Sequence, residues 1–318
     1  MNAPFFSVVI PVYNRATSLA AAIASVRTQS FQDFEILVVD DGSTDNPRAV
    51  VTALHDCRIR FIRQINAGGG AARNTGIEHA QGAFVAFLDS DDLFLPHHLE
   101  SMHALLRGTT GQAGYARVRV DRGNGRIFLK PPRALDAHEN MASYLLCDRG
   151  FTPTITMVVP REAAAQVRFD EHLRAAEDSD FAIRLSLAGT RFTMLQAPGA
   201  IWNDRHGPDR LSASRGGKEF NAWLVRLKPD IPARAWHGAR GWAYAKLIVR
   251  RHPLAALGLY LNALLRGCYR PRLALAIFLQ IFLGPVLYRR LADAGIAWLR
   301  LGLRESQERS QPVRLKRA

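Results

Sequence analysis

The sequence predicts an α/β fold in which a parallel sheet is covered by helices on both faces. The chain has 318 residues, of which 48% are hydrophobic, so it is long enough to bury a sizeable core. Over the first hundred residues, short β-branched runs alternate with stretches whose apolar residues recur at helical spacing. Strands that alternate with helices in this way form parallel sheets, which are buried on both faces.

Four strands and three helices are expected in this first part of the chain. A strand begins at Phe6 and is ended by Pro11, and a helix capped by Thr17 or Ser18 follows. The other strands are predicted at Glu35–Val39, Arg58–Ile62 and Ala83–Leu88, and the helices around Pro47–His55 and Ala71–Ala80. In such sheets, ligands lie beyond the carboxyl ends of the strands.

After Pro96 the pattern becomes mixed. A helix is expected to about Arg107, and a helix from Asp178 to Ala188 is ended by Gly189. Strands are predicted at Tyr115–Val120 and Thr154–Val159, with a hairpin turn at Gly123–Gly125 and a mobile Ser/Gly/Arg-rich loop near Leu211–Gly217.

The positive charge is concentrated in the last third of the chain. Residues 1–200 hold 20 Lys and Arg against 21 Asp and Glu, whereas residues 201–318 hold 22 against 7. This asymmetry predicts a near-neutral unit, residues 1–215, followed by a basic, mostly helical extension, residues 216–318. The partner of the extension is an acidic surface, either lipid headgroups or nucleic acid. No aromatic-interleaved basic motif or zinc pattern supports nucleic acid, so we expect an anionic membrane surface.

Two apolar stretches in the extension support that expectation. Pro253–Leu265 and Leu273–Tyr288 carry no charge, and each is shorter than the ~20 residues of a spanning helix. Arginines flank both: Arg250, Arg251, Arg266, Arg270, Arg272, Arg289 and Arg290. This arrangement suits helices that lie in the headgroup layer, although a buried hairpin packed on the rest of the chain or on a second subunit remains open.

The first residues of the sequence and the spacing of its cysteines favour a cytoplasmic location. No charged, apolar and small-residue leader precedes Phe6, and the three cysteines show no CxxC spacing. We therefore expect a cytoplasmic protein that attaches peripherally to the inner face of the cell membrane.

Acidic residues follow two of the predicted strands directly. Asp40 and Asp41 come after the second strand, and Asp89, Asp91 and Asp92 after the fourth. Two carboxylates one residue apart at a strand end can direct oxygens at one hard cation. An Asx turn and a helix cap are the structural alternatives, but three adjacent carboxylates repel unless a cation offsets them.

Two further segments carry candidate chemistry. Gly68–Gly76 is a glycine-rich entry into a helix, where backbone amides and Arg73 can meet phosphate oxygens. It is not a dinucleotide fingerprint, because Arg73 stands in place of the third glycine. Glu177 and Asp178 open a later helix, where a carboxylate stays ionised as a general base must. An ordinary acidic helix start is the alternative.

Together these motifs resemble those of the inverting glycosyltransferases of family 2, which have the GT-A fold. The resemblance covers roughly residues 5–215, and it rests on Pro11–Asn14, Asp40–Asp45, Ala71–Gly76, Asp89–Asp91 and Glu177–Asp178. It implies a nucleoside-diphosphate sugar donor, Mg²⁺ or Mn²⁺, and direct displacement with inversion at the anomeric carbon. The Gln-x-x-Arg-Trp motif of processive synthases is absent from the sequence, which favours transfer of a single sugar.

The resemblance also implies roles for individual residues. The donor would be bound by Pro11, Tyr13, Asp40, Asp41, Arg73 and Asp89, with Tyr13 and Asp41 at the nucleobase. The metal would be held by Asp91 and Asp89, together with His206, although Arg205 and His206 are adjacent here rather than separated as in the family. Asp178, beside Glu177, would deprotonate the acceptor hydroxyl. The acceptor is expected to be a glycan or lipid-linked glycan in the synthesis of a cell-surface polysaccharide or glycolipid.

Two other functions compete with this interpretation. A sugar nucleotidylyltransferase would need a Gly-x-Gly-Thr-Arg loop after the first strand, where this chain has Pro11–Asn14. A catalytically idle nucleotide-sugar-binding protein or membrane scaffold would not need the intact carboxylates, and hydrolysis of the donor by purified protein separates it from an enzyme.

Overall fold

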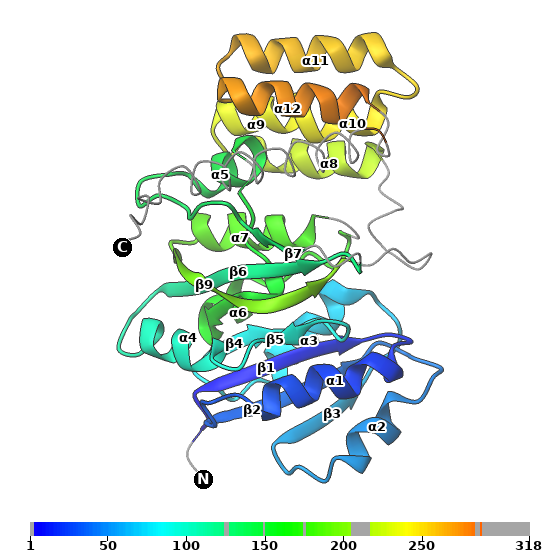
Figure 1. Ribbon diagram of the computed structural model, residues 1–318, viewed down its shortest axis with the longest axis vertical. Helices are drawn as coiled ribbons and strands as arrows, with labels where there is room; N and C mark the ends of the chain where they lie inside the picture. Colours follow the sequence, from blue (N-terminus) through cyan, green and yellow to red (C-terminus); the bar gives the residue numbers. More distant parts are fainter. Residues whose placement is uncertain are drawn as a thin grey trace, which may run out of the picture.

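The computed structural model describes residues 3–123, 127–148, 150–173, 176–204, 217–283 and 287. Within these ranges, nine strands form one sheet in the order β3-β2-β1-β4-β8-β6-β9-β5, and β7 pairs with β6. Figure 1 shows the parallel strands at one end of the molecule and helices α8 to α12 stacked at the other.

The parallel half of the sheet is as predicted. β1 (Phe6–Val12) lies between β2 (Phe34–Asp40) and β4 (Phe84–Phe87), and β3 (Ile59–Arg63) pairs with β2. The connecting helices are α1 (Ala16–Arg27), α2 (Pro47–Ala53) and α3 (Gly69–His79).

Two predicted boundaries in this half are wrong. β1 continues through Pro11, which pairs with Val39. β4 pairs with β1 only as far as Val9. Pro11 lies beyond that pairing, so the N–H group that proline lacks is not required for a hydrogen bond to β4. Helix α1 begins at Ala16 and not after Thr17 or Ser18, because the distant Asp45 Oδ2 accepts a hydrogen bond from the Ala16 N–H at 2.7 Å.

The rest of the sheet is mixed. Its strands are β5 (Leu93–Phe94), β6 (Gln112–Asp121), β7 (Ile127–Lys130), β8 (Val158–Pro160) and β9 (Arg191–Asn203). Its helices are α4 (His98–Leu106), α5 (Met141–Cys147), the 3₁₀ turn η1 (Thr154–Thr156), α6 (Arg161–Val167) and α7 (Glu177–Leu187). β6 and β7 form the predicted antiparallel hairpin, although Asn124 and Gly125 of its turn lie outside the described residues.

The predicted strand at Thr154–Val159 is only partly correct. Its first half is the turn η1, and only Val158 onward is a strand. The Thr156 hydroxyl accepts from the Ala116 N–H at 3.1 Å and lies 2.9 Å from the Ala116 carbonyl oxygen, to which it donates. At Ala116 of β6, the Thr156 side chain therefore makes the hydrogen bonds that the backbone of a paired strand would otherwise make.

The sheet separates two apolar layers. Phe6, Val8 and Ile10 face one layer with α1 and α4, whereas Val9 faces the other with α3 and α7. Helix α3 lies very close to β1: a Cβ added at Gly76 would sit 2.3 Å from Val9 Cγ1. This close contact fixes the position of the α3 N-terminus over the carboxyl ends of the strands.

The C-terminal helices form two groups. α8 (Gly217–Leu227) and α9 (Ala233–Ala239) pack into the same core as α5 and α7. The π-helical turn η3 (Arg240–Tyr244), α10 (Ala245–Ile248), α11 (Pro253–Leu265) and α12 (Pro271–Phe282) follow, and a separate apolar cluster lies among them. No helix in the described ranges is long and apolar enough to cross a membrane. Residues 205–216, which include the proposed unit boundary and most of the expected mobile loop, lie outside the described residues, as does most of the chain beyond Leu283.

Candidate active site

Two of the predicted donor-binding motifs form one unit at the end of β1 and β2. The Asn14 N–H donates to Ser43 Oγ at 3.0 Å, and Asn14 Oδ1 accepts from the Thr44 N–H at 2.8 Å. These bonds join the loop after β1 to the turn after β2. Pro11 is half-buried in β1, whereas Tyr13 stands at the surface with half of its area exposed, so its ring is free to stack on a ligand.

The two aspartates after β2 have different surroundings. Asp40 is fully buried: its Oδ1 accepts from the Ser43 N–H at 2.8 Å, and its Oδ2 has no hydrogen-bond partner. Asp41 accepts from Gln64 Nε2 and from the N–H groups of Ala67 and Gly68 at 2.8 to 2.9 Å. Asp41 therefore anchors the glycine-rich start of α3 to the end of β2.

Arg73 brings the other two acidic clusters together. Its guanidinium is almost completely buried, and it donates to Asp89 Oδ1 at 2.6 Å while lying 3.9 Å from Glu177 Oε1. The Phe169 ring lies beneath it, with its centroid 5.4 Å from Arg73 Cζ. Burial lowers the pKa of Arg73, but Asp89, Asp178 and Glu177 together raise it above its ordinary value. The end of β4 and the start of α7 thus meet across one cation.

Asp178 is the most perturbed carboxyl group in this cluster. Its Oδ1 is buried with no hydrogen-bond partner. Burial, and then the negative charge of Glu177, raise the pKa of Asp178 to about 7, against the opposing effect of Arg73. A carboxyl group with this pKa can accept and release a proton near neutral pH.

Asp180, the third acidic residue of that segment, serves the fold. Its Oδ1 accepts from Trp223 Nε1 at 2.8 Å, and its Oδ2 accepts from Arg184 Nε at 2.7 Å. It therefore joins α7 to α8 and takes no part in the carboxylate cluster.

The aspartates that follow β4 are crowded. Asp91 forms an ion pair with Arg15 and is about one-third exposed, and the buried Asp92 accepts from the Asn203 N–H at 2.8 Å. Burial raises the pKa of both carboxyl groups, and neighbouring carboxylates raise them further. Such crowding fits a divalent cation, which would offset the repulsion.

The structure supplies few protein ligands for a metal. In the part of the chain that the structure describes, no three His, Cys, Asp or Glu side chains come together as a metal site. Mg²⁺ commonly uses one or two carboxylates together with substrate phosphates, so Asp91 and Asp89 fit this use. His206, the third predicted ligand, lies outside the described residues.

Three residues at the site were not predicted as part of it: Arg15, Phe169 and Asn203. Arg15 directly follows the Pro11–Asn14 motif after β1, so the sequence could have identified it as a residue near the ends of the strands. Phe169 and Asn203 come from segments with no motif. Asn74 holds Phe169 in place, because it donates to the Phe169 carbonyl oxygen and accepts from its N–H.

Comparison with known proteins identifies the family of the chain. Residues 7–174 match the model of the family described as glycosyl transferase family 2. The amylovoran biosynthesis glycosyltransferase AmsB of Erwinia amylovora is 31% identical over 242 residues, which cover 72% of this chain and 79% of AmsB. The succinoglycan biosynthesis protein ExoW of Rhizobium meliloti is 32% identical over 286 residues, covering 77% of this chain and 89% of ExoW.

A third relative matches a shorter segment of the chain. The UDP-Glc:alpha-D-GlcNAc-diphosphoundecaprenol beta-1,3-glucosyltransferase WfgD of Escherichia coli is 41% identical over 130 residues, which cover 40% of this chain and 51% of WfgD.

Solved structures share the fold. TarS of S. aureus, residues 1–349 in complex with UDP-GlcNAc, superposes with a TM-score of 0.62 at 20% identity, covering 88% of this chain and 87% of that one. The mannosyltransferase PcManGT of Pyrobaculum calidifontis, in complex with GDP-Man and Mn²⁺, gives a TM-score of 0.56 at 17% identity, covering 94% and 81%. The chain therefore belongs to glycosyltransferase family 2 and has the GT-A fold.

Proposed function

We propose that this glycosyltransferase moves a single sugar from a nucleoside-diphosphate sugar to an acceptor hydroxyl, with inversion and with the help of a divalent cation. The observation that carries the proposal is the meeting of Asp89, which follows β4 at the carboxyl-end edge of the sheet, with Glu177 and Asp178 of α7 around the buried Arg73. This edge is where an α/β sheet binds ligands.

Asp178 acts as the general base in this proposal. The acceptor oxygen forms a bond to the anomeric carbon from one face while the bond from that carbon to the diphosphate oxygen breaks on the other, and the electron pair leaves with the diphosphate. The hydroxyl proton passes to an Asp178 carboxylate oxygen. The raised pKa of Asp178 supports this role, because a base whose pKa lies near the working pH is the most effective.

The donor lies against the other residues of the strand ends. Tyr13 stacks on the nucleobase, and Pro11, Asp40, Asp41 and the start of α3 shape its surroundings. Asp91 and Asp89 would hold Mg²⁺ or Mn²⁺. When bound, the cation would neutralise charge that develops on the diphosphate. Arg15 pairs with Asp91 and would contact the donor phosphates if a cation took its partner.

The acceptor is proposed to be a glycan or lipid-linked glycan. AmsB and ExoW are named for polysaccharide biosynthesis, and WfgD for transfer to a diphosphoundecaprenol-linked sugar. A lipid-linked acceptor is presented at a membrane. We therefore place the enzyme in the bacterial cytoplasm, bound peripherally to the inner face of the membrane through its basic C-terminal helices.

A two-step experiment tests this function. A thermal-shift screen of UDP-, GDP- and dTDP-sugars with and without Mn²⁺ identifies the donor, because a ligand that binds the native state raises its melting temperature. The radiolabelled donor is then incubated with bacterial membranes, and label in the butanol extract reports a lipid-linked product. A donor that binds but yields neither labelled product nor hydrolysis would favour the idle sugar-nucleotide-binding protein.

A further inference from the structure

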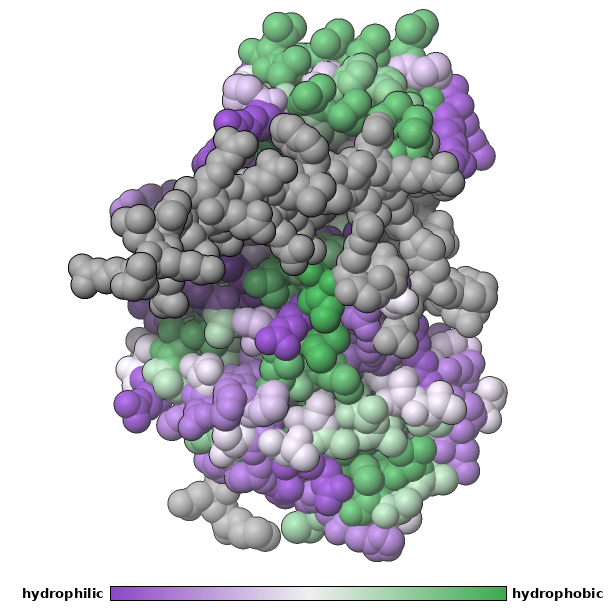
Figure 2. Space-filling model, in the orientation of Figure 1, coloured by the Kyte–Doolittle hydropathy of each residue, from purple (hydrophilic) through white to green (hydrophobic). Residues whose placement is uncertain are grey.

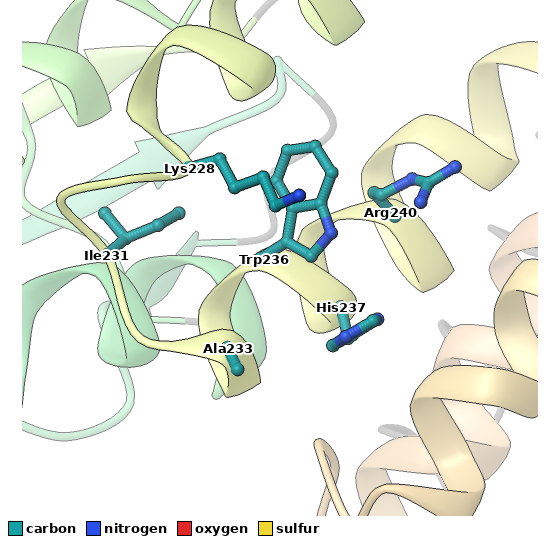
Figure 3. A pocket seen from close by; sticks show the side chains of 6 residues that line it. All are labelled: Lys228, Ile231, Ala233, Trp236, His237 and Arg240. Atoms are coloured by element: carbon teal, nitrogen blue, oxygen red, sulfur yellow. The ribbon is translucent and has the colours of Figure 1, made fainter.

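A cavity with a cationic lining lies among the C-terminal helices. Its volume is about 410 Å³, and it is lined by Lys228, Ile231, Ala233, Trp236, His237 and Arg240. Figure 3 shows these side chains around the turn between α8 and α9, along α9 and at the start of η3. None of them belongs to the elements that carry the carboxylate site, so the proposed reaction leaves this cavity without a role.

The lining is organised around one aromatic ring. Lys228 Nζ and Arg240 Cζ each lie 5.3 Å from the centre of the Trp236 ring, and Figure 3 shows the Lys228 side chain crossing over the indole. Arg240 Nε is buried and has no hydrogen-bond partner. No carboxylate lines the cavity. A buried donor without an acceptor is costly. A lining with two cations and no carboxylate favours an anion as its ligand.

A further cation lies beside this lining. Arg266 Nε donates to Asn262 Oδ1 at 3.1 Å, and the Asn262 side chain also hydrogen-bonds to His237. Burial lowers the pKa of His237, and Arg266, Arg240 and Lys228 lower it further. Three positive side chains from different segments therefore act on the His237 imidazole. No carboxylate is among the charges that shift its pKa.

Exposed leucines precede Arg266 in the sequence. Leu261, Leu264 and Leu265 lie in the last turns of α11, directly before Arg266, and Leu265 is 88% exposed. Figure 2 shows apolar surface at this end of the molecule, bordered by hydrophilic residues. A cationic cavity and exposed leucines on one group of helices suit the boundary between headgroup and acyl chain in a phospholipid layer. A nucleic acid would offer phosphates but would leave the leucines in water.

We propose that the cavity at Trp236 binds the phosphate of an anionic phospholipid headgroup while the α11 leucines enter the acyl region. The inference rests on the membrane association proposed above, and it assigns that association to a specific site. Lys228 and Arg240 hold the phosphate oxygens, and the Trp236 ring lies within cation–π distance of both cations.

Co-sedimentation with vesicles tests this site. The pocket variant is Lys228→Gln/Arg240→Gln, and the matched control is Arg250→Gln/Arg251→Gln, which removes the same charge from exposed positions before α11. On vesicles of phosphatidylglycerol in phosphatidylcholine, we expect the pocket variant to lose at least tenfold more partitioning than the control. Equal losses would overturn the headgroup site and leave diffuse electrostatic docking in place.

Additional vesicles and variants separate the remaining outcomes. Phosphatidylcholine vesicles in which oleate supplies the same negative charge as phosphatidylglycerol should bind the wild type more weakly than the phosphatidylglycerol vesicles, because oleate carries no phosphate. Equal binding to the two kinds of vesicle would overturn phosphate recognition. Leu261→Ser/Leu265→Ser should weaken binding in high salt, and no effect would contradict the apolar contact. A wild type that ignores all vesicles but binds single-stranded RNA through the pocket residues would overturn both this site and the membrane proposal. The thermal-shift response to the donor checks that each variant is folded and tests the transferase proposal independently.

Discussion

At the scale of single residues, the candidate site depends on charges that compensate one another across long sequence separations. Arg73 is buried, and a buried guanidinium is tolerated only when carboxylates surround it. Asp89 and Glu177 supply them from β4 and α7. The motifs identified these residues as candidates, but their pairing could not be predicted, because it depends on how the elements pack in three dimensions.

Replacement of Asp178 tests its role as the base. We expect Asp178→Asn to bind the donor normally but to transfer sugar about 10²–10⁴-fold more slowly, because an amide cannot accept the proton. Initial rates with the donor from the screen measure this. Glu162→Gln on α6, at an exposed position, is the control and should transfer at the wild-type rate. Near wild-type transfer by Asp178→Asn would remove the residue from the mechanism.

The pH dependence of transfer follows from the raised pKa of Asp178. A base acts only when it is deprotonated, so kcat/KM should rise about tenfold per pH unit below a pKa of about 7 and level off above it. Rates measured from about pH 5.5 to 9 give the profile. A profile that is already flat at pH 5.5 would mean that the proton is accepted by a group with an ordinary carboxyl pKa or by none.

At the scale of elements, the sequence predicts the regular parts of the fold and misses those determined by distant partners. The four parallel strands follow from β-branched runs. β9 was missed because Pro198 and Gly199 interrupt it and its buried residues do not alternate. The start of α1 was misplaced because its cap comes from Asp45, which belongs to another loop.

The contact between α3 and β1 makes a prediction about stability. Gly76→Ala places a methyl group 2.3 Å from Val9 Cγ1, so α3 must shift, and we expect a loss of about 1–3 kcal/mol in the free energy of unfolding. Gly258→Ala in α11 has no atom within 4 Å of the new methyl group and should gain about 0.5–1 kcal/mol. Urea denaturation measures both. If Gly76→Ala were as stable as Gly258→Ala, the close packing would be wrong.

At the scale of the whole molecule, the helix that carries the proposed base is joined to the C-terminal helices. Asp180 lies two residues after Asp178, and its Oδ1 accepts from Trp223 of α8 at 2.8 Å. α8 and α9 share one apolar core with α7, and the cationic cavity lies on α9. The proposed phosphate-binding cavity and the helix that carries the proposed base are therefore joined through one apolar core.

Trp223→Phe tests this link. Phenylalanine keeps most of the apolar contact but leaves the buried Asp180 Oδ1 without its donor, which should cost about 1–3 kcal/mol of stability. Trp223→Phe/Asp180→Asn also removes the carboxylate that pairs with Arg184, so the double variant should be no more stable than Trp223→Phe. Thermal denaturation measures both variants, and full stability of Trp223→Phe would show that the hydrogen bond does not hold α8 in place.

The central claim is that the carboxylates at the strand ends bind a nucleoside-diphosphate sugar through a divalent cation. Its most direct test is calorimetric titration of the donor from the screen into the wild type and Asp91→Asn, each with Mn²⁺ and with EDTA. We predict that Mn²⁺ tightens binding to the wild type at least tenfold and leaves binding to Asp91→Asn unchanged. Equal affinity of the wild type in Mn²⁺ and EDTA, or a full Mn²⁺ effect in Asp91→Asn, would contradict the account.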